Sequence, residues 1–119
     1  MFFKRSKYNS KKIKIDGITF HSELEGRCYI FLKDKVKNLE LQPKFLLQEK
    51  FKYRNKTIRK IEYIADFKFD YQSVEYIIDS KGLETPVFKL KYKLLVGKYP
   101  KLNFYTVKSL KKLRELLNF

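Results

Sequence analysis

The sequence is poor in the residues that build covalent or zinc cross-links. It contains one cysteine, Cys28, and one histidine, His21. A single cysteine excludes an internal disulfide and fits a reducing compartment, and one residue of each kind cannot supply a Cys/His set for zinc. No apolar run approaches the roughly 18 residues that span a bilayer, and the start Met-Phe-Phe-Lys-Arg lacks the apolar stretch of a signal peptide. We therefore expect a soluble, cytoplasmic protein that makes no membrane contact.

Glycine, proline and acidic residues are also scarce. Four Gly and three Pro among 119 residues, with 44% hydrophobic and 17% aromatic residues, argue against a disordered chain and favour one folded domain. Thirteen acidic residues face 28 basic ones, a formal charge of +15. Such a charge costs stability by self-repulsion and is most easily understood if the partner is a polyanion. Six of the cations lie in residues 4–14, which we interpret as a flexible arm or an edge strand that orders on a partner.

The pattern of apolar residues predicts a mixed α/β fold. We expect a basic N-terminal arm over residues 1–15 and a single domain over 16–119, with one mixed central sheet flanked by helices. Predicted helices start at the N-caps Ser22, Thr85 and Ser109, the first running to about Lys37 and the second to about Lys98. Predicted strands cover residues 18–20, 39–51, 58–71, 74–81 and 102–107, with a hairpin turn at 52–56. Pro43 either confines the segment 39–51 to a sheet edge or breaks it into two pieces. Val87, Leu90, Leu94 and Leu95 are expected to face the core.

Two carboxylates and one lysine carry the strongest chemical signal. Asp66 and Asp79 lie near the ends of two predicted neighbouring strands, and Lys81 shares a strand face with Asp79. An acid pair beside an ammonium group suits a divalent metal and a water to be activated, and in so basic a chain the obvious substrate is a phosphodiester. Each residue also has a purely structural interpretation: Asp79 and Lys81 could form an ion pair at a strand end, and Asp66 could be an exposed carboxylate.

Glu25 and a pair of lysines each allow both a structural and a functional interpretation. Glu25 completes a capping box with Ser22, yet it also falls within the core-facing arc of its helix, from which it could reach the ends of the strands. Lys89 and Lys93, spaced i and i+4, form either a solvated helix face or a stripe that contacts phosphates.

Together with five ordered blocks, these residues resemble a small, largely phage-encoded family of the PD-(D/E)XK nuclease superfamily. The resemblance covers about residues 16–99 and rests on the blocks FHSELE (20–25), LELQPKF (39–45), YIADF (63–67), IDSKG (78–82) and TPVFK (85–89). It implies a restriction-endonuclease-like core, with Asp66 as the superfamily Asp, Asp79 as its Asp/Glu, Lys81 as its Lys and Glu25 as its first-helix acid. The second acid is Asp where Glu is commoner.

The resemblance implies an Mg²⁺-dependent DNA endonuclease, located in the host-cell cytoplasm if phage-encoded. Asp66, Asp79 and a main-chain carbonyl near Ser80 would hold Mg²⁺, or Mn²⁺ in its place, Glu25 would complete the set, and Lys81 would orient the attacking water. By analogy with junction resolvases, a homodimer cutting branched DNA such as junctions or flaps is expected. The expected phosphate contacts are Lys4, Arg5, Lys7, Lys11, Lys12, Lys89 and Lys93. The alternatives are a non-catalytic nucleic-acid-binding module and a nuclease subunit of a larger recombination or packaging assembly.

Overall fold

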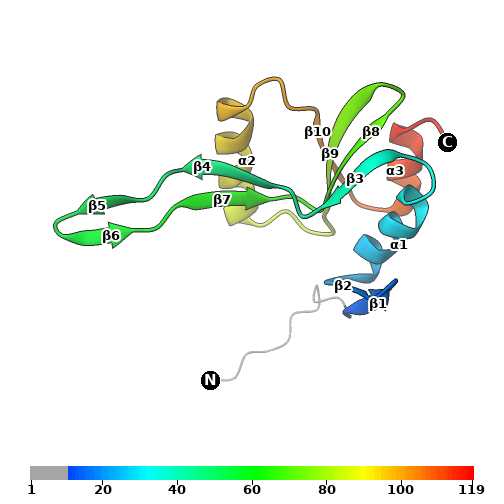
Figure 1. The fold of residues 1–119 in the computed structure, drawn as a ribbon, viewed down its shortest axis with the longest axis horizontal. Helices are drawn as coiled ribbons and strands as arrows, with labels where there is room; N and C mark the ends of the chain where they lie inside the picture. Colours follow the sequence, from blue (N-terminus) through cyan, green and yellow to red (C-terminus); the bar gives the residue numbers. More distant parts are fainter. Residues whose placement is uncertain (1–10) are drawn as a thin grey trace.

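The computed structural model of the chain describes residues 11–119 and confirms a mixed α/β fold (Figure 1). Three helices and ten strands lie in this part of the chain. In chain order they are β1 (Ile13–Ile15), β2 (Ile18–Phe20), α1 (Glu23–Leu32), β3 (Lys37–Leu41), β4 (Lys44–Gln48), β5 (Phe51–Tyr53), β6 (Lys56–Ile58), β7 (Ile61–Ile64), β8 (Phe67–Tyr71), β9 (Val74–Ser80), α2 (Pro86–Lys98), β10 (Phe104–Val107) and α3 (Leu110–Leu116). The three predicted N-caps, Ser22, Thr85 and Ser109, each accept a main-chain N–H of the first helical turn.

The central sheet has four strands in the order β10-β9-β8-β3. β8 pairs antiparallel with β9, as the sequence predicts, and β10 pairs parallel with β9. The β8–β9 turn consists of Gln72 and Ser73, both with positive φ, which is the backbone form that matches the twist of a two-residue hairpin. β9 and β8 therefore both pair on two edges and form the interior of the sheet.

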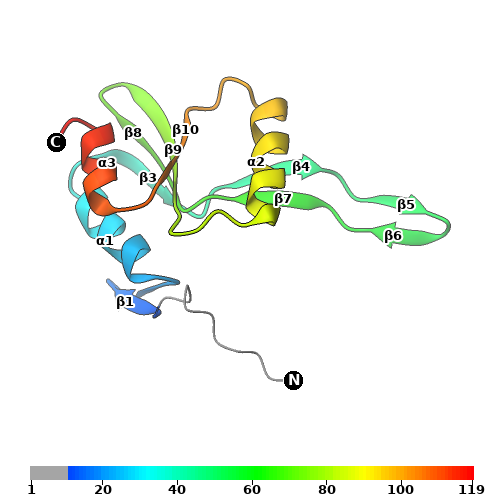
Figure 2. The same ribbon diagram turned by 180° about the vertical axis from the view of Figure 1, so that it is seen from behind.

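Helices cover the two faces of this sheet. The first core cluster packs α1 and α3 against side chains such as Phe67, Phe69 and Ile78. The second cluster packs α2 against Tyr63 and Ile77. Neighbouring strand residues point to opposite faces, so Ile77 and Ile78 divide β9 between the two layers. Figures 1 and 2 show α2 on one side of the sheet and α1 with α3 on the other.

A long two-stranded ribbon projects from the sheet, formed by β4 with β7 near the body and β5 with β6 at the tip (Figure 2). The predicted single strand over 58–71 is therefore wrong: it is three strands, interrupted at residues 59–60 and again at Ala65–Asp66. On the paired strand, Gln42 has φ 54° and Pro43 follows it. Two bonds hold the bend, from Gln42 N–H to the Asp66 carbonyl (3.0 Å) and from Ala65 N–H to the Pro43 carbonyl (3.1 Å). Asp66 consequently lies at the root of the ribbon.

The first helix is shorter than predicted, and one strand occupies part of the predicted arm. α1 ends at Leu32 instead of near Lys37, because the next residues turn back into β3. Ile13–Ile15 forms β1, which pairs with β2 and packs on α1. A Cβ on Gly26 would lie 2.9 Å from Ile13 Cγ2, so the close approach of β1 to α1 requires glycine there. Residues 1–10 of the predicted arm lie outside the described part of the chain.

The predicted buried face of α2 is largely wrong. Leu95 is buried, but Val87, Leu90 and Leu94 are exposed, Val87 by 63%. Phe88 is buried instead, against Tyr63. α2 carries apolar residues on two stripes, and the β4–β7 part of the ribbon, which the sequence did not reveal, determines which stripe is covered.

Candidate functional site

Asp66 lies where the sheet splits between β7 and β8, and its carboxylate is tied to the neighbouring strand. Its Oδ2 accepts the main-chain N–H of Ser80 at 2.8 Å and the Ser80 hydroxyl at 2.7 Å. Its own main-chain N–H donates to the carbonyl of Ile78 at 3.2 Å. The side chain is therefore fixed against the end of β9.

Asp79 is one of the most buried residues of the domain, with 1% of its surface exposed. Its Oδ2 accepts the hydroxyl of Tyr63 and lies 3.5 Å from Nζ of Lys81. Burial, followed by the charge of Asp66, raises the pKa of Asp79 to about 7. The Lys81 ammonium also lies 5.2 Å from the centre of the Phe88 ring. Asp79 and Lys81 thus form a partly buried ion pair on the face of the sheet that carries α2.

Glu25 approaches the same place from α1. The capping box is present, with Glu25 N–H donating to the Ser22 hydroxyl at 3.0 Å, but Glu25 Oε1 accepts the N–H of His21 rather than that of Ser22. The side chain is buried to 94%, and burial, followed by the charge of Asp66, raises the pKa of Glu25 to about 7. Glu25 therefore uses one carboxylate oxygen for the hydrogen bond to His21, and its carboxyl group lies close to that of Asp66.

The fold thus brings together every residue predicted at the reaction centre. Asp66 is close enough to interact both with Glu25 and with Asp79. The positive charge of Lys81 lowers the pKa of Glu25 and that of Asp79. One ammonium group faces three carboxyl groups, so the cluster has excess negative charge in a molecule of strongly positive net charge. Like charges held together at low solvent exposure are unfavourable unless a proton or a cation compensates them.

The donor set fits a hard divalent ion such as Mg²⁺. Within residues 11–119, hydrogen bonds from the His21 N–H, from Ser80 and from the Tyr63 hydroxyl engage Glu25 Oε1, Asp66 Oδ2 and Asp79 Oδ2 respectively. No group of three or more His, Cys, Asp or Glu side chains in this part of the chain is arranged to hold a metal ion. Mg²⁺ needs fewer than three protein ligands, because it commonly binds one or two carboxylates and completes its coordination shell with water and substrate phosphate. The pair Asp66 and Asp79 meets that requirement, and Glu25 adjoins it.

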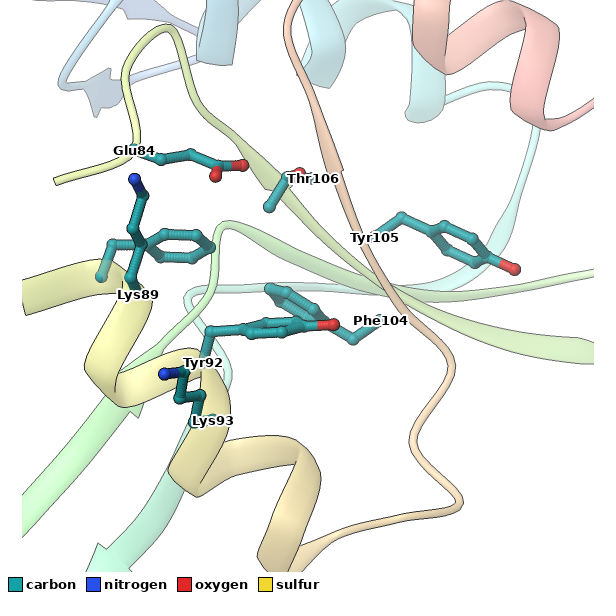
Figure 3. A pocket seen from close by; sticks show the side chains of 8 residues that line it. Glu84, Lys89, Tyr92, Lys93, Phe104, Tyr105 and Thr106 are labelled. Atoms are coloured by element: carbon teal, nitrogen blue, oxygen red, sulfur yellow. The ribbon is translucent and has the colours of Figure 1, made fainter. Parts of the chain in front are cut away.

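A groove between α2 and β10 adjoins this cluster (Figure 3). The α2 side contributes Lys89, Tyr92 and Lys93, and β10 contributes Phe104 to Thr106. Thr106 is the strand partner of Asp79, and Phe88, under the Lys81 ammonium, also lines the groove. Lys89 and Lys93 are both exposed and line this groove together with the acidic Glu84.

Of the other predicted phosphate contacts, Lys11 and Lys12 lie in the described part of the chain. Both are exposed and come just before β1, the strand that contacts α1. Lys4, Arg5 and Lys7 lie outside the described residues. No helix of residues 11–119 is both long and apolar enough to cross a membrane.

Sequence reasoning missed two residues that hold the acids. Tyr63 donates its hydroxyl to Asp79 and has a raised pKa, chiefly through burial. The Ser80 side chain, expected to matter only through its main-chain carbonyl, orients Asp66. The alternation that placed Tyr63 on a buried face was visible in the sequence, but the partner of a buried Tyr hydroxyl depends on which strands pair.

Comparison with protein families gives one result. Residues 5–114 match the family described as "Protein of unknown function (DUF1064)". The chain belongs to this family. Searches among curated proteins and among solved structures found no match. The DUF1064 match spans all of the acids and Lys81, as well as the groove lysines, so the cluster lies within the part that defines the family.

Proposed function

We propose that this protein is an Mg²⁺-dependent endodeoxyribonuclease of the PD-(D/E)XK type. The observation that supports it most is the meeting of Glu25, Asp66, Asp79 and Lys81 at the split edge of the sheet, although these residues come from α1, from the β7–β8 break and from β9. A purely structural role explains this poorly, because three carboxyl groups at one place cost stability.

In this proposal the residues of the site bind, orient and supply charge. Asp66 and Asp79 would hold the ion, with a main-chain carbonyl near Ser80, and Glu25 would bind beside them. The bound ion would provide Lewis-acid stabilisation of the phosphodiester and ease the deprotonation of water. Lys81 would orient the attacking water and compensate the charge that develops on phosphorus, since its ammonium is held near Asp79 by that carboxylate and by Phe88.

The groove and the net charge suggest the substrate. Lys89 and Lys93 would bind phosphates on either side of the scissile linkage, so affinity should fall steeply with salt. We propose branched DNA, such as a junction or flap, cut by a two-fold dimer, because a small domain with one site needs a second copy to nick paired strands.

The test is cleavage of linear duplex, single-stranded, flap and four-way-junction DNA, with Mg²⁺, with Mn²⁺ and with EDTA. We expect metal-dependent cleavage, fastest on the branched substrates, and its loss in Asp66→Asn. Binding of DNA without cleavage of any substrate would instead identify a non-catalytic binding module. Activity that appears only with added phage recombination proteins would identify a subunit of a larger assembly. Equal cleavage by wild type and Asp66→Asn would refute the site.

A further inference from the structure

The tip of the ribbon is the most strongly charged segment of the described chain. Residues 50–60 carry six cations and no acid: Lys50, Lys52, Arg54, Lys56, Arg59 and Lys60. All residues from 51 to 60 are exposed, and among residues 11–119 only Lys60 of these six cations is in an ion pair, with Glu62 at 3.4 Å. Five cations therefore project into solvent without a counter-charge.

The ribbon also exposes apolar and aromatic side chains. Phe51 lies opposite Ile58 and Tyr53 opposite Lys56, so these four share one face, while Lys52 and Thr57 share the other. Phe51, Tyr53 and Ile58 are 45%, 56% and 38% exposed. Figures 1 and 2 show that no other element of the described chain covers this tip. A ligand for this surface must offer negative charge and apolar contact together.

The turn at the tip points to a charged ligand as well. Arg54 and Asn55 both have positive φ, 51° and 65°, a conformation for which Asn-Gly is the favoured pair. Any residue with a Cβ at the first of these positions costs about 1–2 kcal/mol of backbone strain, and here that residue is a cation. The Arg54 guanidinium lies 5.1 Å from the centre of the Tyr53 ring, in the turn that joins β5 to β6.

We propose that the β5–β6 ribbon binds duplex DNA, with its strands in the major groove and its cations on the flanking phosphates. The B-form major groove is about 12 Å wide and admits a two-stranded β-ribbon, and thymine methyl groups there offer apolar contact to Phe51, Tyr53 and Ile58. A second copy of this chain is a poor occupant, because two ribbons with six cations each would repel one another.

The ribbon is long enough to reach the duplex beyond the cleavage site. Asn55 lies eleven positions before Asp66, so at about 3.3 Å per residue the tip extends up to about 36 Å from the acid cluster. One turn of B-DNA is about 35 Å long. The ribbon therefore binds the same duplex arm about one turn from the scissile linkage, an inference that rests on the proposed nuclease site for its second anchor point.

The experiment measures binding without catalysis. The triple variant Lys52→Gln/Arg54→Gln/Lys56→Gln is compared with the charge-matched control Lys108→Gln/Lys111→Gln/Lys112→Gln, whose residues are exposed near α3 at the opposite end of the molecule. Fluorescence anisotropy follows the titration of a labelled 30-base-pair DNA duplex, and an RNA duplex of the same sequence, in EDTA at several salt concentrations. Thermal melts confirm that each variant is folded.

The ribbon variant should bind DNA at least tenfold more weakly, with a log–log salt slope smaller by about 2 to 3, and the control should change affinity less than threefold. RNA binding should change less than DNA binding, since the A-form major groove is too deep and narrow for the ribbon. Equal losses in the ribbon variant and the control, no DNA binding by wild type, or an equal loss for RNA and DNA would overturn the proposal. This titration measures binding and no cleavage. A failure of the nuclease proposal would therefore show only in the separate cleavage assay and would leave the binding result unchanged.

Discussion

Ser80 donates both its main-chain N–H and its hydroxyl to the same carboxylate oxygen of Asp66, at 2.8 and 2.7 Å. The two residues are fourteen apart in the sequence and meet because β8 pairs with β9. This contact fixes one oxygen of Asp66, whose charge acts on both Asp79 and Glu25. Groups that orient a metal ligand commonly matter almost as much as the ligand itself.

Removing the Ser80 hydroxyl should therefore weaken metal-dependent function without unfolding the protein. We expect Ser80→Ala to raise the Mg²⁺ concentration for half-maximal cleavage by about 10-fold or more. Ser80→Thr keeps a hydroxyl and should retain most of the affinity. Metal titrations of the cleavage rate decide the matter, and an unchanged midpoint in Ser80→Ala would contradict the orienting role.

Asp79 should destabilise the fold at neutral and higher pH. Its pKa is raised to about 7 by burial and then by Asp66, from 3.8. For a raised pKa the stabilising contribution is complete below the unfolded value and is lost as pH rises through about 7. We expect Asp79→Asn to be more stable than wild type at pH 8, by about 1–3 kcal/mol, and to lose less stability between pH 4 and pH 8.

Thermal melts without metal at both pH values measure this effect. The exposed Glu75, on the same strand, supplies the control Glu75→Gln, which should follow the wild-type pH dependence. If Asp79→Asn is less stable than wild type at pH 8, the bond from Tyr63 outweighs the buried charge.

Substitution of Lys81 should lower the cleavage rate, whereas substitution of Lys89 should weaken DNA binding. Lys81 contacts Asp79, whereas Lys89 lines the groove. We expect Lys81→Ala to lower the cleavage rate about 10²- to 10³-fold while DNA affinity changes less than threefold. Lys89→Ala should weaken DNA binding, reduce its salt dependence and preserve the rate at saturating DNA. Single-turnover kinetics and anisotropy separate the two effects, and a wild-type rate in Lys81→Ala would remove it from the reaction centre.

Two helical glycines should respond oppositely to alanine. A Cβ on Gly26 would meet Ile13 and Ile15 at 2.9 and 3.0 Å, whereas one on Gly97 meets nothing within 4 Å. Gly26→Ala must displace β1 from α1 and should destabilise by about 1–3 kcal/mol. Gly97→Ala should be neutral or stabilise by up to about 1 kcal/mol, because Ala is the better helix former. Urea unfolding curves measure both, and equal shifts would contradict the packing of β1.

Local signals predicted the starts of the three helices and two of the chain reversals correctly. The caps Ser22, Thr85 and Ser109, the break at Pro43 and the turn at Arg54–Asn55 are all as expected, since each depends on residues within one turn. The wrong predictions concern features that depend on contacts between residues far apart in the sequence. Uninterrupted alternation over 58–71 suggested one strand, but the bend at Ala65–Asp66 depends on pairing with Gln42 and Pro43. Likewise, the buried stripe of α2 depended on the ribbon beneath it.

The sequence alone determined which residue types were available for chemistry and on what kinds of elements they lie. Caps, turns and alternation are local, so Asp66, Asp79 and Lys81 could be placed near strand ends and Glu25 on a helix from the chain itself. Only the tertiary structure decided that these groups meet, that Tyr63 and Ser80 hold them, and that a hairpin turn is the tip of a long basic ribbon. Distances between residues far apart in the chain depend on strand pairing and packing, which no local pattern encodes.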